Sequence, residues 1–402
     1  MKESFKAVKI TDTVYWVGAI DWTLQDFHGY LTKRGTTYNA YLIMDEKITL
    51  IDTVKLKYKN ELIARISSVV DPGNIDYIIS NHSEMDHSGC LPEIIKLIKP
   101  EKVFASKMGV KTLAAHFPGN TDIAEISAVD DLGTLNLGKL TLKFIETKML
   151  HWPDSMFTYI EEEKFLFSQD AFGMHLATNH MFADEVDEGI VYYEAGKYYA
   201  NILLPYSDRI LKLLEQVTEM KLEINYIATD HGPIWRKDFD KVFGWYSKWA
   251  VQKPEKRAVI VFDTMWGSTE MMARAVSEGI KSEGISSKVL HLAGNHRSDI
   301  AKEILCAGAF IAGSPTINNK MFPTMADLFC YLGGLRPKNL IGFAFGSYGW
   351  SGESIKHLEE ELKDMDVEIT GPGIKAKYVP DDEILKECFN RGVEIAKRLK
   401  AH

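Results

Sequence analysis

The feature that most limits how this chain can fold is a short polar segment, residues 77–90, which reads Tyr-Ile-Ile-Ser-Asn-His-Ser-Glu-Met-Asp-His-Ser-Gly-Cys. Its first residues, Tyr77 to Ile79, are aromatic or β-branched and predict a buried strand. Four side chains that commonly bind metals follow within six residues, namely His82, Glu84, Asp86 and His87. If the chain leaves the strand extended, residues 82, 84 and 86 can share one face. A polar loop before a helix would explain any one of them, but the four together predict a metal-binding loop.

The loop resembles the His-x-His-x-Asp-His signature of the metallo-β-lactamase superfamily, except that Glu84 replaces the usual second histidine. A carboxylate is a harder and more negative donor than an imidazole. A complete site needs further ligands at the ends of downstream strands, and the chain offers His151, Asp170 and His231. Three ionised carboxylates would leave two divalent ions at about plus one, which a bridging hydroxide brings near zero. Four histidines and three carboxylates favour a pair of iron ions over a zinc hydrolase site.

Composition narrows the class of protein. The chain has 402 residues, enough for two domains, and its net charge of -9 argues against nucleic-acid binding. No apolar run approaches the roughly 20 residues of a membrane span, and the N-terminus lacks the apolar core of a signal peptide. The cysteines form no Cys-x-x-Cys pair, so we expect reduced thiols in a cytoplasmic protein without a built-in rubredoxin or iron–sulfur module. They are Cys90, Cys306, Cys330 and Cys388.

The first 250 residues predict a mixture of strands and helices. Strands are expected at 13–18, 37–44, 48–52, 103–106 and 140–146, and helices at 60–70, 107–116 and 191–220 with a break at Pro205. The superfamily resemblance implies a four-layer αββα sandwich. Residues 251–257 are polar, charged and proline-bearing, as linkers are, so we expect one domain over 1–250 and another over 251–402.

The second domain alternates strands with helical segments, which predicts a doubly wound parallel sheet. The strands are expected at 258–262, 288–292, 309–312 and 340–345. Ligands of such sheets bind beyond the carboxyl ends of the strands. Three loops at those ends are unusual in composition.

The first loop places hydroxyls and a glycine before a helix, which predicts an anion site; it comprises Thr264, Met265, Trp266, Gly267, Ser268 and Thr269. It has neither the lysine of a P-loop nor a Gly-x-Gly-x-x-Gly pattern, so a single terminal phosphate fits best. Simple helix capping by Ser268 or Thr269 is the alternative, but it explains only one hydroxyl.

The other two loops hold glycines and small polar groups that let backbone amides approach a flat heterocycle. The second comprises Ser314, Pro315, Thr316, Asn318 and Asn319, and the third Gly346, Ser347, Tyr348, Gly349, Trp350, Ser351 and Gly352. The three loops in this order resemble a flavodoxin. The resemblance implies that the phosphate of FMN lies on the first loop and its isoalloxazine ring between the other two.

Taken together, the two halves resemble the flavodiiron proteins over nearly the whole chain. That family implies a cytoplasmic reductase of dioxygen or nitric oxide, fed by rubredoxin and assembled as a head-to-tail homodimer or a dimer of dimers. By the same resemblance, His82, Glu84 and His151 would hold one iron; Asp86, His87 and His231 the other; and Asp170 would bridge them. His87 can be swung away from the metal in some members. His28 and Tyr198 would donate hydrogen bonds to a bound oxygen or nitrogen ligand, or else are a structural histidine and a packed aromatic.

The electron count explains why one chain would carry both sites. Dioxygen reduction to two waters takes four electrons, of which two ferrous ions supply two and reduced FMN two. Two molecules of nitric oxide need only two electrons to form nitrous oxide.

Two other hypotheses for the function of the chain remain. One is a zinc hydrolase with a regulatory flavodoxin domain, and the other is an electron carrier whose lactamase-like domain is only structural. Glu84 argues against the first, and the full set of seven ligands argues against the second.

Overall fold

The computed structural model describes residues 4–129 and 133–401. The chain forms two compact units. The N-terminal unit comprises residues up to 28, 32–198 and 208–245, and the C-terminal unit comprises 29–31, 199–207 and the chain from 246 onward. The domain boundary after residue 250 stays a prediction. Helix α8 (Phe239–Val251) runs through that point, and only residues 252–254 separate it from strand β17 (Glu255–Phe262).

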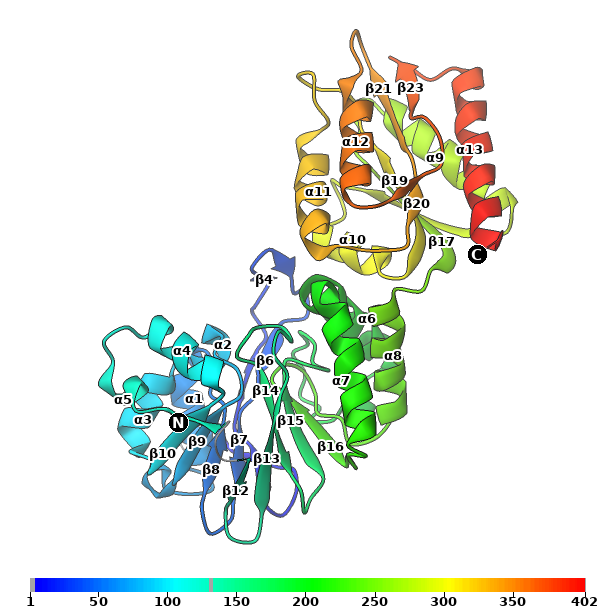
Figure 1. The fold of residues 1–402 in the computed structure, drawn as a ribbon. Helices are drawn as coiled ribbons and strands as arrows, with labels where there is room; N and C mark the ends of the chain where they lie inside the picture. The colour runs from blue at the N-terminus through cyan, green and yellow to red at the C-terminus, as the bar shows by residue number, and fades with distance from the viewer. Residues whose placement is uncertain (1–3, 130–132, 402) are drawn as a thin grey trace. The chain divides into compact units, whose positions relative to one another are not determined.

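Two β-sheets form the middle of the N-terminal unit (Figure 1). Within the described residues the first runs β1-β2-β7-β8-β9-β10-β11, antiparallel as far as β8 and parallel beyond it. Its strands are β1 (Val8–Lys9), β2 (Val14–Trp16), β7 (Tyr41–Ile43), β8 (Thr49–Ile51), β9 (Tyr77–Ser80), β10 (Lys102–Ala105) and β11 (Ser127–Ala128).

The second sheet runs β12-β13-β14-β15-β16, and only its last pair is parallel. Its strands are β12 (Thr134–Asn136), β13 (Thr141–Glu146), β14 (Met156–Ile160), β15 (Phe165–Gln169) and β16 (Tyr226–Thr229). Short strands β3 (Ala19–Asp21) and β6 (Thr36–Tyr38) pair with each other. Strands β4 (Asp26–Phe27) and β5 (Tyr30–Leu31) lie in the chain between them.

Residue alternation in β9 explains how the layers stack. Ile79 packs between the two sheets with Phe104 and Phe167, while its neighbour Ile78 faces the other way, in a cluster with Leu62 and Ile94. Both isoleucines are fully buried because both faces of this strand are covered. The metal loop therefore leaves the sheet from a strand held on both sides.

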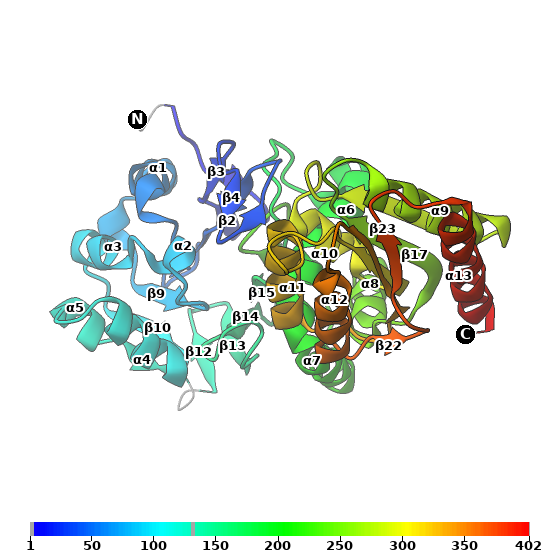
Figure 2. The same cartoon turned by 90° about the horizontal axis from the view of Figure 1, so that it is seen from above.

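Helices cover the outer faces of both sheets. Figures 1 and 2 place one set beside the first sheet: α1 (Lys59–Ile66), α3 (Leu91–Ile98), α4 (Lys107–His116) and α5 (Thr121–Ala124). On the far side of the second sheet lie α6 (Glu188–Tyr198) and α7 (Ser207–Glu219), joined by a π-helix (Tyr199–Leu203) and a 3₁₀-helix (Leu204–Tyr206). Further 3₁₀-helices lie at Leu56–Tyr58, Pro72–Asn74 and Ala183–Glu185. The predicted αββα sandwich is confirmed.

The C-terminal unit is a doubly wound parallel sheet, as predicted. Its order is β18-β17-β19-β20-β22, with β21 pairing with β19 and β23. The strands after β17 are β18 (Ser286–His291), β19 (Ala307–Gly313), β20 (Ile341–Gly342), β21 (Ala344–Tyr348), β22 (Glu368–Ile369) and β23 (Ile374–Lys377). The helices are α9 (Ser268–Ser282), α10 (Arg297–Ile304), α11 (Pro323–Leu335), α12 (Glu353–Asp364) and α13 (Asp382–Ala401).

One predicted strand, 37–44, is divided in the structure. Its residues form β6 and β7, which belong to different sheets. The break falls at Asn39, whose backbone N–H donates to the carbonyl of Asp230 over 2.8 Å. Its side-chain amide donates to the carbonyls of Thr229 and Gly232 over 2.7 and 2.9 Å. Asn39 therefore leaves the ladder to hold the loop that carries His231.

Candidate functional site

The metal loop becomes helical after Glu84. Strand β9 ends at Ser80, and the short helix α2 (Met85–Ser88) has Glu84 at its N-cap. The predicted extended alternation therefore fails at Asp86. His82 and Glu84 face one group of ligand atoms, whereas Asp86 and His87 face a second. The helical turn allows four neighbouring ligands to serve two separate groups.

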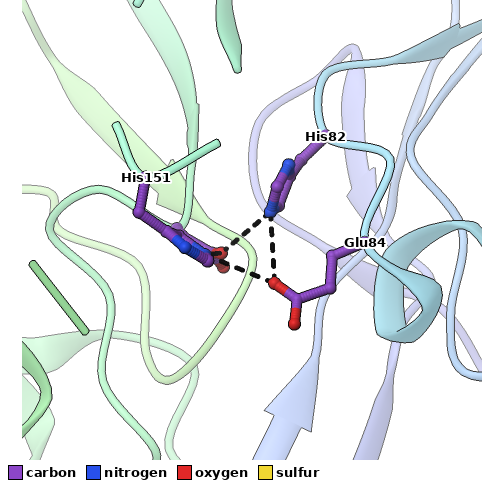
Figure 3. A group of neighbouring side chains, drawn as sticks. His82, Glu84 and His151 are labelled. Atoms are coloured by element: carbon purple, nitrogen blue, oxygen red, sulfur yellow. Dashed lines mark hydrogen bonds and ion pairs between the residues drawn. The ribbon is translucent and has the colours of Figure 1, made fainter. Parts of the chain in front are cut away.

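The first group joins His82, Glu84, His151 and Asp170. His151 Nε2 lies 2.9 Å from Asp170 Oδ2 and 3.3 Å from Glu84 Oε2. His82 Nε2 lies 3.4 Å from each of the same two oxygens. The labelled side chains in Figure 3 point toward one another, His82 and Glu84 from the loop after β9 and His151 from another part of the chain. Their ligand atoms converge on one point.

The second group joins Asp86, His87 and His231. His231 Nε2 lies 3.2 Å from Asp86 Oδ2, and His87 Nε2 lies 3.4 Å from Asp86 Oδ1. The second carboxylate oxygen of Asp170, Oδ1, lies 3.3 Å from His87 Nε2 and 3.5 Å from His231 Nε2. One carboxylate thus faces both groups, with Oδ2 on the first and Oδ1 on the second.

These spacings fit metal coordination. With ligands about 2.1 Å from a metal, neighbouring ligand atoms are about 3.0 Å apart in an octahedron and about 3.4 Å apart in a tetrahedron. The observed separations run from 2.9 to 3.5 Å. His82 Nε2, His87 Nε2 and Asp170 Oδ1 are buried and have no hydrogen-bond partner among the described residues. Buried polar atoms are normally satisfied, so the donor set fits two metal ions.

The strands place two of the downstream ligands as predicted, but not the third. Asp170 directly follows β15, and His231 follows β16 by two residues. His151 instead lies within the loop that joins β13 to β14. Gln169 connects this loop to the strand end, because its side-chain amide donates to Leu150 O over 2.5 Å and its Oε1 accepts from Asp170 N over 2.6 Å.

Outer hydrogen bonds fix two of the histidine rings. The Nδ1–H of His82 donates to Asp154 Oδ2 over 3.1 Å, and the same oxygen accepts from the backbone and the hydroxyl of Ser83, each over 2.6 Å. The Nδ1–H of His231 donates to the carbonyl of Thr37 over 2.6 Å. A proton on Nδ1 leaves Nε2 as the free ligand atom.

Sequence reasoning missed these outer residues and also Asp230, whose Oδ2 lies 3.5 Å from His87 Nδ1. Asp230 directly precedes the predicted ligand His231, and Asp154 follows the predicted ligand His151 by three residues. Their closeness in sequence to predicted ligands is the signal that could have indicated both residues.

Charge at the site favours bound cations. Burial alone would raise the pKa of Glu84, but the neighbouring imidazoles of His151 and His82 outweigh it and lower the pKa to about 2. Burial acts to lower the pKa of His82, yet Asp154 and Glu84 together raise it well above the usual value. Carboxylates around His87 overcome burial in the same way and raise its pKa. The site thus stabilises added positive charge, which metal ions would supply.

The two predicted hydrogen-bond donors occupy different surroundings. His28 Nε2 lies 3.8 Å from Glu84 Oε1, and its side chain is 77% exposed. Tyr198 is buried, with its ring 6.1 Å from that of His231 and 5.0 Å from that of His175. His175, which the sequence did not assign to the site, lies with its ring 4.6 Å from that of His231. Burial and the neighbouring His231 hold the pKa of His175 well below its usual value, so its imidazole is neutral.

In the C-terminal unit, the three predicted loops surround a pocket of about 790 Å³ at the carboxyl ends of β17, β19 and β21. The predicted residues that line it are Met265, Trp266, Ser268, Pro315, Thr316, Asn318, Asn319, Ser347, Tyr348, Gly349, Trp350 and Ser351. Thr264, Gly267, Thr269, Gly346 and Gly352 do not line it. Ile317, which lies within the second predicted loop, also lines the pocket, and so do Tyr378 and Val379, which lie outside all three loops.

The start of α9 is built without a side-chain cap. Its N-cap is Gly267, with φ 86° and no capping side chain, so the capping alternative for Ser268 and Thr269 is not realised. Thr264 Oγ1 accepts from Gly267 N over 3.1 Å, and Thr269 Oγ1 lies 3.0 Å from Ser347 Oγ. These contacts hold the first loop against the third. The amides of the first helical turn are left for an anion.

Two tryptophans at this pocket project into solvent. Trp266 is 94% exposed and Trp350 is 86% exposed. Large apolar side chains gathered at one pocket are typical of a ligand-binding or interaction surface.

The helices of the chain were also compared with the length and apolar character that a membrane span needs. Among the described residues, no helix combines the two.

Comparison with known proteins matches both halves of the chain. A family model described as ODP family beta lactamase matches residues 36–232, and one described as flavodoxin matches residues 260–392. The two matched ranges do not overlap, and one lies in each half of the chain.

Relatives match from end to end. A nitric oxide reductase of Moorella thermoacetica is 47% identical, over 98% of each chain. The solved structure of the rubredoxin oxygen:oxidoreductase of Desulfovibrio gigas has 44% identity and a TM-score of 0.96, covering 98% of this chain and 99% of that one. The flavodiiron protein of Giardia intestinalis has 36% identity and a TM-score of 0.94, covering 98% and 97%. The chain belongs to the flavodiiron protein family.

Proposed function

We propose that this chain is an oxidoreductase that reduces dioxygen to water, nitric oxide to nitrous oxide, or both, with a diiron centre and FMN as its cofactors. The single observation that carries the proposal is the Asp170 carboxylate, whose oxygens face the two ligand groups separately. When bound, the irons would bind the diatomic gas and, with the flavin, supply the electrons. A site for one metal would need no such shared ligand.

The seven proposed ligands would be shared between two irons in the same way as their ligand atoms fall into two groups. His82, Glu84 and His151 would hold one iron, and Asp86, His87 and His231 the other, with Asp170 between them. His87 Nε2 points to the second group, which supports its role as a ligand in this chain. Asp154 and Thr37 would keep His82 and His231 in the tautomer that binds metal.

His28 and Tyr198 are proposed to donate hydrogen bonds to the substrate. The 3.8 Å approach of His28 to Glu84 supports its place beside the first iron. Tyr198 lies by His231 on the side of the second. A neutral His175 between His231 and Tyr198 adds no charge to that pocket.

The pocket of the C-terminal unit is proposed to hold FMN. Ser268, Thr269 and the uncapped first turn of α9 would bind its phosphate, with Thr264 and Gly267 shaping the turn. Loops 314–319 and 346–352 would enclose the isoalloxazine ring. Gly346 allows the close approach there, since a Cβ atom on it would lie 1.9 Å from Ser314 O.

We further propose a rubredoxin-like electron donor, a cytoplasmic location and a head-to-tail homodimer or a dimer of such dimers, with no nucleic-acid or membrane partner. Electron tunnelling falls steeply with distance, so the flavin of one subunit would face the irons of the other, with Trp350 against the partner's metal pocket. The exposure of Trp350 supports a surface that a second subunit covers.

A mixed dimer tests this arrangement. One subunit carries Asp86→Ala with Asp170→Ala and lacks iron, and the other carries Ser268→Ala with Thr269→Ala and lacks flavin. Transfer between subunits leaves one working flavin–iron pair per mixed dimer. An assembled but inactive mixed dimer would rule out transfer between subunits.

Metal analysis and gas consumption test the function itself. Protein produced with iron and zinc both present should contain two irons and one FMN per chain. With chemically reduced rubredoxin it should consume dioxygen or nitric oxide. Zinc in the site with hydrolase activity and no gas consumption would favour the zinc hydrolase instead.

A further inference from the structure

Asp263 is a buried acidic residue at the carboxyl end of the flavodoxin-like sheet. It directly follows β17 and directly precedes the first of the three loops around the pocket. Only 5% of the residue is exposed, and it is not among the residues that line the pocket. Burying a carboxylate is costly unless hydrogen bonds compensate it, so a buried acid outside the pocket wall needs a structural or functional reason.

Three hydrogen-bond donors from three different elements meet on this carboxylate. Its Oδ1 accepts from the backbone N–H of Thr264 over 2.8 Å and lies 3.2 Å from Nε2 of His291, the last residue of β18. Its Oδ2 accepts from the hydroxyl of Thr324, in the first turn of α11, over 2.5 Å. An ionised carboxylate only accepts hydrogen bonds, so the Nε2 of His291 carries the proton in this contact. Asp263 therefore joins the first loop to β18 and to α11.

The bond to Thr264 continues into the turn before α9. The hydroxyl of Thr264 accepts from the backbone N–H of Gly267 over 3.1 Å. Gly267 has φ 86°, and among the described residues no atom beyond its chain neighbours lies within 4 Å of the place a Cβ would take. The glycine is therefore needed for its backbone angle rather than for space. The successive bonds from Asp263 to Thr264 and from Thr264 to Gly267 set the turn that leads into the first amides of α9.

The partners of the carboxylate are themselves held in place. The ring of His291 stacks on that of Phe262, with centroids 5.0 Å apart and planes 11° apart. The start of α11 is also bound to the second loop, because the backbone N–H of Phe322 donates to the hydroxyl of Ser314 over 2.8 Å. All of these residues belong to the C-terminal unit. The carboxylate thus ties the first loop to two fixed supports, one at the end of β18 and one beside the second loop.

We propose that Asp263 is a positioning residue for FMN, which holds the first loop in the shape that the phosphate requires. This inference rests on the proposed function, in which residues of that loop bind the phosphate. Charge alone does not explain an acid at this place, because a carboxylate repels a nearby phosphate dianion. Its hydrogen bonds do explain it, since a loop that is ordered beforehand loses little conformational freedom when its ligand binds. Asp263 therefore contributes to the affinity for the phosphorylated flavin without lining its pocket.

The test uses the full-length, iron-loaded protein, freed of flavin and titrated with FMN and with riboflavin, which lacks the phosphate. In Asp263→Ala the Kd for FMN should rise about 10–100-fold, the effect of losing hydrogen bonds to a charged acceptor. The Kd for riboflavin should stay at the wild-type value. Glu303→Ala is the matched control, because this buried carboxylate of the same unit pairs with Lys288 over 3.0 Å, away from the three loops. It should change neither Kd.

A conservative variant separates the hydrogen bonds of Asp263 from its charge. In Asp263→Asn the amide oxygen can still accept from the Thr264 N–H, and the amide NH₂ can donate to the Thr324 hydroxyl. The affinity for FMN should therefore return close to the wild-type value. A loss in Asp263→Asn as large as in Asp263→Ala would overturn the proposal. Equal losses of FMN and riboflavin affinity in Asp263→Ala would overturn it too, because they indicate damage to the whole pocket.

A milder variant covers the case in which Asp263→Ala does not fold. Thr324→Val removes one donor to the carboxylate with little change of shape and is titrated in the same way. FMN should bind about threefold more weakly and riboflavin as in the wild type. Unchanged FMN affinity in Thr324→Val would contradict the role of Asp263. Wild-type protein that binds riboflavin as tightly as FMN would instead overturn the proposed phosphate site, and the role of Asp263 with it.

Discussion

Asp154 offers a sharp test of how the first metal group is built, because it touches the site only through His82 and Ser83. Its Oδ2 accepts hydrogen bonds from His82 Nδ1, Ser83 N and Ser83 Oγ. All of these groups are buried. Asp154→Ala removes the common acceptor and leaves the ligands themselves unchanged.

The expected losses of stability and of metal affinity in Asp154→Ala follow from those contacts. A buried donor left without an acceptor costs roughly 1–3 kcal/mol, and water entering the space left by the carboxylate would recover part of it. We therefore expect the metal-free variant to lose about 2–4 kcal/mol of unfolding free energy. Removing an outer partner of a metal-binding histidine weakens metal affinity about 10–100-fold. That loss should fall on the iron held by His82, Glu84 and His151.

Two measurements check this prediction. Iron release to a chelator should be biphasic in Asp154→Ala, with one iron lost early and the other retained as in the wild type. Urea unfolding of the metal-free protein gives the stability change. Asp45→Ala is the control, since Asp45 also accepts two hydrogen bonds from backbone amides, those of Lys139 and Leu140, but outside the metal site. If both irons are lost together, or neither is, the assignment of Asp154 to His82 alone is wrong.

Three further predictions follow from the same contacts. Asp170→Ala should lower the iron content of both positions while FMN stays bound, and unchanged iron content would remove Asp170 as the shared ligand. Ser268→Ala with Thr269→Ala should weaken FMN retention because hydroxyls at the start of α9 are lost, with iron content normal; a fully yellow double variant would contradict the phosphate site. Burial raises the pKa of the Cys306 thiol to about 11 and that of Cys388 to about 12, so at pH 8 both remain protonated. Iodoacetamide should then label the exposed Cys330 in folded protein and reach the others only after unfolding; early labelling of Cys306 would contradict its burial.

The sequence was informative where chemistry is concentrated in a short stretch. Residues 82–87 bring four possible metal ligands together behind a buried strand, and few structures other than a metal site have a use for that combination. Asp170 and His231 could be predicted because each lies at or just beyond the end of a strand. The helix predicted at 107–116 has the same bounds in the structure, with Ser106 as its N-cap. Local signals of this kind need no knowledge of distant contacts.

The parts that could not be predicted depend on tertiary contacts. Asp154 lies three residues after His151, but the contact that its carboxylate makes with His82 joins positions 72 residues apart and could not be predicted from this local sequence. Tyr378 reaches the pocket of the C-terminal unit because β23 pairs with β21, although residues 349–373 lie between the two strands and give no hint of the pairing. The division of Asp170 between two groups is a matter of carboxylate orientation, which only the folded structure determines. Tertiary contacts also set the helical turn at Met85–Ser88, against the extended path predicted for it.

The central claim is that one chain combines a diiron centre bridged by Asp170 with an FMN to reduce a diatomic gas. Anaerobic reductive titration of the iron- and FMN-loaded protein, followed by stoichiometric addition of dioxygen or nitric oxide, tests it most directly. We expect each chain to take up four electrons, two at the irons and two at the flavin, and one of the gases to reoxidise both centres. Titration of only the flavin, or reoxidation of the flavin while the irons stay reduced under both gases, would contradict it.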